Sequence, residues 1–175
     1  QVGTALLLEP YCDTFFPPSS CCNCTTNYKG LDFWANSDLT ASMRQANKAG
    51  LQIHVHTIAD GAAKRAVDSL QSAGVSKKMR PAMAHLQLIS DEYVAKMAQL
   101  GVTASVTMVW PVIDIFSSAY YYPRLGFDRM YHAQYPFQSM FDLGINVATG
   151  SDFPVALPLY NQHTFTGMTR LLSQG

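Results

Sequence analysis

Residues 50–66 read GLQIHVHTIADGAAKRA, and this stretch decides the fold because a short β-rich run passes directly into a helical pattern. Gly50 suits the left-handed position after a helix, and residues 51–56 are typical of a strand. His54 and His56 lie one residue apart on that strand. The pair is compatible with three interpretations: two metal ligands, one ligand beside a bystander, or two packed core residues.

The same order of helix, glycine and strand occurs four times along the chain. Helical patterns cover 37–50, 60–74, 90–101 and 136–144, and strands are expected within 51–56, 80–86, 102–110 and 145–155. Strands that alternate with helices predict a parallel sheet, so the expected fold class is α/β. Four units cannot close a (β/α)8 TIM barrel, which needs eight strands and typically ~250 residues. The sequence therefore predicts either an open sheet or a partial barrel.

Two segments interrupt this pattern. Residues 1–36 form an irregular N-terminal segment that contains Cys21, Cys22 and Cys24. A zinc site there lacks the C-x2-C spacing and a second cysteine pair, so a surface loop is the preferred interpretation. Residues 112–135 are rich in tyrosine and predict either a lid or binding wall, or a helical insertion packed by its aromatic side chains.

Composition narrows the range of partners. The chain has 175 residues, 48% of them hydrophobic and 14% charged, and 12 Lys and Arg balance 12 Asp and Glu. Because no strongly basic surface is indicated, nucleic acid and anionic membranes are not expected as partners. No apolar run reaches the roughly 20 residues of a membrane span, and no secretory leader is visible. We expect a cytoplasmic protein that acts on a small molecule.

Three polar residues follow strands of the predicted sheet. His56 and His85 end the first two strands, and Asp152 follows the fourth. Active sites of α/β proteins assemble at the carboxyl ends of parallel strands, so these side chains are expected to converge. Two imidazoles and a carboxylate suit zinc or a similar divalent ion. For each histidine alone, a packed or surface position remains the simpler interpretation.

Three blocks of the chain resemble the amidohydrolase superfamily. They are HVHTIADGAAKRAVDSL, RPAMAHLQLISDEYVAKMAQLGVTASVTMVW and RMYHAQYPFQSMFDLGINVATGSDFPV. They are most similar to YtcJ-like metal-dependent hydrolases, which are related to N-substituted formamide deformylases and more distantly to D-aminoacylases. The resemblance implies that residues 37–175 form about strands 5–8 of a (β/α)8 barrel. It also implies hydrolysis of an amide or related C–N bond by metal-activated water.

The resemblance assigns roles to individual residues. His56, His85 and Asp152 match metal ligands of the family, and such an aspartate also takes the proton from the attacking water. Asp60 and Trp110 are secondary candidates for supporting the site, with a helix cap and a core position as their simpler roles. His56 then lies at the barrel mouth, whereas His54 is expected one layer deeper, buried and hydrogen-bonded.

Two departures from the family pattern have consequences. The block reads HTIAD, without a glycine before the aspartate, and the family's H-x-H pair on strand one and its bridging residue from the middle of the barrel have no counterpart in this chain. The chain is therefore expected to be a fragment that begins after strand four, with an exposed sheet edge that favours self-association. A non-catalytic half barrel is the main alternative. A phosphate-binding open sheet is disfavoured because no glycine-rich phosphate loop follows a strand.

Overall fold

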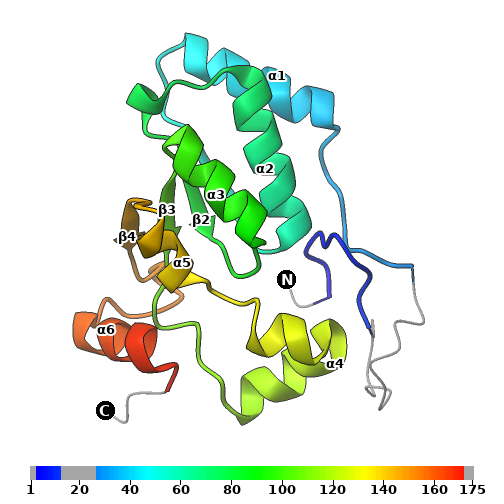
Figure 1. Ribbon diagram of the computed structural model, residues 1–175, viewed down its shortest axis with the longest axis vertical. Helices are drawn as coiled ribbons and strands as arrows, with labels where there is room; N and C mark the ends of the chain where they lie inside the picture. Colours follow the sequence, from blue (N-terminus) through cyan, green and yellow to red (C-terminus); the bar gives the residue numbers. More distant parts are fainter. Residues whose placement is uncertain (1–2, 13–26, 172–175) are drawn as a thin grey trace.

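The computed structural model describes residues 3–12 and 27–171, and its centre is a parallel sheet (Figure 1). The strands lie in the order β1-β2-β3-β4, and each neighbouring pair is parallel. They are β1 (His54–Thr57), β2 (Ala82–His85), β3 (Thr103–Val106) and β4 (Val147–Thr149). This confirms the α/β class and agrees with a partial barrel. Cys21, Cys22 and Cys24 lie outside the described residues.

Helices alternate with the strands as the sequence predicts. They are α1 (Asn36–Lys48), α2 (Asp60–Ala73), α3 (Asp91–Leu100) and α5 (Phe137–Asp142), with a short 3-10 turn η1 (Lys77–Met79) before β2. Gly74 and Gly101 end α2 and α3 in the left-handed conformation. In Figure 1, α1, α2 and α3 form one layer beside the sheet.

The two faces of the sheet differ in burial. Met83, Ala104 and Val106 point toward the helices and are almost completely buried in the main core, as are Val67 and Val94 of that layer. The opposite face carries His54, His56, Ala84, Ser105 and Ala148, all of which are exposed or half-buried. Because side chains alternate along a strand, the face that would point into a barrel is the accessible one here.

The aromatic segment is helical. It forms α4 (Ile115–Tyr131), which begins with a capping box between Asp114 and Ser117 and is kinked at Gly126, where φ is 76°. The structure shows that the segment is helical, and its role as a lid, a binding wall or a packed insertion stays a prediction. In Figure 1, α4 lies apart from the α1–α3 layer. It contacts the N-terminal segment, since Arg129 Nη2 donates to Pro10 O at 2.9 Å.

One helix was not expected from the sequence. The last helix, α6 (Tyr160–Thr169), reads YNQHTFTGMT. Its threonines, asparagine and glycine have low helix propensity, and its apolar residues do not repeat on one face, so no helical pattern is visible. Every helix in the described parts of the chain is too short or too polar to cross a membrane.

Candidate functional site

His56 and His85 meet at the carboxyl ends of β1 and β2. Their ring centroids are 4.5 Å apart with 70° between the ring planes. Alternation along β2 would place His85 on the helix side with Met83. However, His85 and Leu86 have φ values of 71° and 53°, and this left-handed backbone brings the imidazole to the side of His56. Such sparsely populated conformations in non-glycine residues cluster at functional sites.

Trp110, from the segment after a third strand, packs on the His85 ring. It follows β3, and its ring stacks on His85 with centroids 5.2 Å apart and planes inclined by 8°. Trp110 is half-buried and packs against the main core. A stacked, anchored indole restricts the orientation of the imidazole, while the contact with the main core also agrees with the simpler core position, so the supporting role of Trp110 stays a prediction.

The environment of His85 favours a neutral imidazole. The side chain is 8% exposed, and its Nδ1 is buried without a hydrogen-bond partner among the described residues. Burial lowers the pKa of His85, the neighbouring His56 and His54 lower it further, and Asp152 opposes them. Because a metal binds the unprotonated nitrogen, these conditions suit a ligand. An unsatisfied buried nitrogen is also costly unless something binds it.

Asp152 lies near the histidines without completing a metal site. It follows β4, is exposed, and has a φ of 55°. Its charge acts on His85, yet no group of three or more His, Cys, Asp or Glu side chains in the described ranges is arranged to hold an ion. His56 and His85 thus fit two positions of a divalent shell. The expectation that all three ligands converge is met for the two histidines only.

His54 departs from the expected position. It points to the same side of the sheet as His56, as alternation requires, but it is exposed rather than buried. The physical reason is that this side chain lies on the sheet face that the described helices do not cover. The prediction of a buried His54 is therefore wrong for this structure.

Asp60 has a structural contact that the sequence only partly predicts. Its Oδ1 accepts hydrogen bonds from the backbone N–H of Gly61 at 2.8 Å and of Leu8 at 3.0 Å. The Ala62 N–H donates to Leu6 O at 3.1 Å. Leu6 O and the Asp60 carboxylate thereby satisfy the N–H groups of Ala62 and Gly61 in the first turn of α2, which otherwise lack partners.

Sequence reasoning did not select Arg124, which lies on α4 and lines a pocket beside the same strand ends. The only available signal was one arginine within the aromatic run of residues 120–127, and that pattern does not distinguish a surface arginine from a buried one.

Known proteins with similar sequences cover most of this chain. The chain is 31% identical over 157 residues to the protein LONG AFTER FAR-RED 3 of Arabidopsis thaliana, covering 88% of this chain and 24% of that protein. It is 26% identical over 152 residues to the putative amidohydrolase YtcJ of Bacillus subtilis, covering 87% and 26%. The chain therefore spans about a quarter of the length of these curated relatives.

Solved structures share the fold. An uncharacterised metal-dependent hydrolase from Pyrococcus horikoshii superposes with a TM-score of 0.73 at 21% identity, covering 94% of this chain and 30% of that one. A second, from Pyrococcus furiosus, gives 0.70 at 23% identity, covering 89% and 29%. The family model described as the amidohydrolase family matches residues 1–167. With this match over nearly its whole length, the chain belongs to the amidohydrolase family.

Proposed function

We propose that this chain is the C-terminal half of a metal-dependent hydrolase barrel that cleaves an amide or related C–N bond of a small molecule, with zinc as the metal. The observation that carries the proposal is the contact between His56 and His85. Two imidazoles from neighbouring strand ends lie 4.5 Å apart, and one of them has a buried Nδ1 without a partner among the described residues. That spacing is short enough for both rings to reach one ion at Zn–N distances of ~2.0–2.1 Å.

Each residue then has a distinct part. A divalent ion would polarise the scissile carbonyl and make water acidic near neutral pH. His56 and His85 hold the ion, and Trp110 fixes the orientation of His85 by stacking. Asp152 takes a proton from water and returns it to the leaving amine. As an exposed carboxylate, Asp152 is accessible to substrate.

A second candidate function is a half barrel without catalytic activity. It is favoured by one observation, namely that no third ligand joins the two histidines in the parts of the chain that the structure describes. Both candidates predict zinc binding, and only the first predicts turnover once the remaining strands and ligands are supplied.

Zinc content after dialysis against Zn²⁺ tests the proposal. We expect zinc binding by the wild-type chain to fall strongly in His56→Ala and His85→Ala, and less in Asp152→Ala. His132→Ala is the matched control, because this histidine ends α4 and packs on Phe127. If all four variants retain the same zinc content as the wild type, the proposed site is wrong. Release of aniline from N-acyl anilides, measured after the remaining strands and ligands have been supplied, then separates the catalytic from the non-catalytic candidate.

A further inference from the structure

The loop that begins at His85 is held on one side by the end of β1. Leu86 N donates to Thr57 O at 2.8 Å, and Leu88 N donates to Ile58 O at 2.9 Å. His85 and Leu86 have left-handed backbones, and such conformations in non-glycine residues persist only where the surrounding structure enforces them. The contacts that enforce this backbone therefore decide where the His85 imidazole points.

The segment after α4 holds the same loop from the other side. Tyr135 N donates to Gln87 O at 2.8 Å, and an isolated antiparallel bridge joins Leu88 to Gln134. The side chains continue this pairing, because Gln87 Nε2 donates to Gln134 Oε1 at 2.6 Å. Gln134 Nε2 in turn donates to Met130 O, in the last turn of α4, at 2.9 Å. A continuous chain of hydrogen bonds thus runs from α4 to the second residue after β2.

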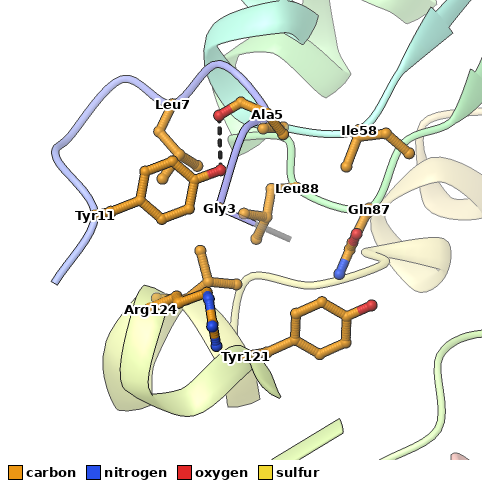
Figure 2. Close-up of a pocket in the computed structure, with 11 residues that line it drawn as sticks. Gly3, Ala5, Leu7, Tyr11, Ile58, Gln87, Leu88, Tyr121 and Arg124 are labelled. Atoms are coloured by element: carbon orange, nitrogen blue, oxygen red, sulfur yellow. Dashed lines mark hydrogen bonds between the residues drawn. The ribbon is translucent and has the colours of Figure 1, made fainter. Parts of the chain in front are cut away.

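Gln87 is buried, so its amide depends on this partner. The residue is 7% exposed and lines a pocket of about 300 Å³ between the N-terminal segment and α4. Figure 2 shows its side chain extending from the loop after β2 toward Tyr121 of α4. A buried amide that loses its acceptor costs free energy, so it turns toward another partner and moves the backbone that carries it. Loss of Gln134 would therefore disturb the two residues before Gln87, which are His85 and Leu86.

We infer that Gln134 is a positioning residue for the histidine pair: through Gln87 it holds the left-handed backbone that brings the His85 imidazole to His56. Strand alternation alone would turn the His85 side chain toward the helices, where Met83 packs in the main core. The last turn of α4 then anchors the loop next to the site. This role in a metal site rests on the proposed function, whereas the contact between the two rings does not require metal.

The contact between the imidazole rings of the metal-free chain tests the inference. Their centroids lie 4.5 Å apart, so NMR of the chelator-treated wild type should show a nuclear Overhauser effect between the ring protons of His56 and His85. Gln134→Met removes the acceptor for Gln87 with little change in side-chain length, and we expect it to abolish this effect. Gln134→Glu keeps an acceptor oxygen and loses only the donor to Met130 O, so we expect it to retain the effect.

Further variants separate positioning from a general loss of stability. Gln87→Met should give the same result as Gln134→Met, and the double variant should lose nothing more, because both changes break one link. Gln138→Met is the matched control, because Gln138 donates to Asp142 Oδ1 at an exposed position on α5. Far-ultraviolet circular dichroism verifies folding, and Gln87→Met keeps the test decisive if Gln134→Met does not fold.

Zinc titration measures the consequence for metal binding. We expect Gln134→Met to bind zinc at least about tenfold more weakly than the wild type, as for other groups that orient metal ligands. A wild-type chain that binds no zinc would refute the proposed function and leave the ring contact as the test of Gln134. Absence of the Overhauser effect in the wild type, its persistence in a folded Gln134→Met or Gln87→Met, or its equal loss in Gln134→Glu would overturn the inference.

Discussion

Replacing Gly61 by alanine is expected to release the N-terminal segment from α2. A Cβ at Gly61 would lie 2.7 Å from Leu6 O and 2.9 Å from Leu7 C, closer than side-chain carbons approach backbone atoms. The segment must then move away. The movement would break the bonds from Ala62 N to Leu6 O and from Leu8 N to Asp60 Oδ1, which are 3.1 and 3.0 Å long.

The change in the free energy of unfolding follows from two opposing contributions, the lost hydrogen bonds and the gain in helix propensity. The bond between neutral groups is worth about 1 kcal/mol and the bond to the carboxylate about 1.5–3 kcal/mol. Alanine in place of glycine returns about 1 kcal/mol of helix propensity. Gly61→Ala should therefore lower the free energy of unfolding by about 1.5–3 kcal/mol, as the difference of these contributions.

Urea denaturation measures the change, and hydrogen exchange at the Leu8 amide shows whether the segment is released. Gly167→Ala is the control, because that glycine is also helical and the atoms nearest to its added Cβ would be side-chain atoms of Met108 at 3.2–3.4 Å, farther away than the backbone atoms that Gly61→Ala would meet. A Gly61→Ala protein as stable as Gly167→Ala, with the Leu8 amide still protected, would refute the reasoning.

Three further results are expected. Trp110→Ala should raise the pKa of His85 toward its ordinary value, because the imidazole of His85 loses part of its burial. NMR titration measures this pKa, with the exposed Trp34→Ala as the control, and an unchanged pKa would show that the stacking is unimportant. Met83→Ala should cost about 2–5 kcal/mol in thermal unfolding, since the side chain is fully buried, and a cost below 1 kcal/mol would contradict its core position. We propose that the outer edge of β1 and the apolar groove of about 680 Å³ beside it mediate self-association. Light scattering should show a concentration-dependent dimer that Leu51→Lys weakens. A wild-type chain that stays monomeric at every concentration would exclude this self-association.

The repeated elements could be predicted because their signals are local. Glycines at helix ends, such as Gly74 and Gly101, mark where each helix stops. The repeated order of helix, glycine and strand then places His56 and His85 at the ends of strands. Parallel pairing of β1 and β2, which the alternation of elements implies, brings the two strand ends together, whereas the turn of the His85 ring toward His56 depends on the left-handed backbone there.

Other features depend on long-range contacts and escaped prediction. The left-handed backbone at His85 has no sequence signature, since histidine does not require a positive φ. The exposure of His54 depends on which elements cover the sheet, and a strand pattern does not contain that information. The pocket around Arg124 joins residues more than 100 positions apart, from Gly3 to Leu125, so no local pattern indicates it.

The central claim is that His56 and His85 bind one metal ion together. X-ray absorption at the zinc edge of the zinc-loaded chain tests this claim most directly, because it counts imidazole ligands and distinguishes Zn–N distances of ~2.0–2.1 Å from Zn–S distances of ~2.3 Å. We predict two imidazoles bound to zinc in the wild type, and one or none in His56→Ala and His85→Ala. A spectrum dominated by sulfur, or two imidazoles that persist in both variants, would contradict the account.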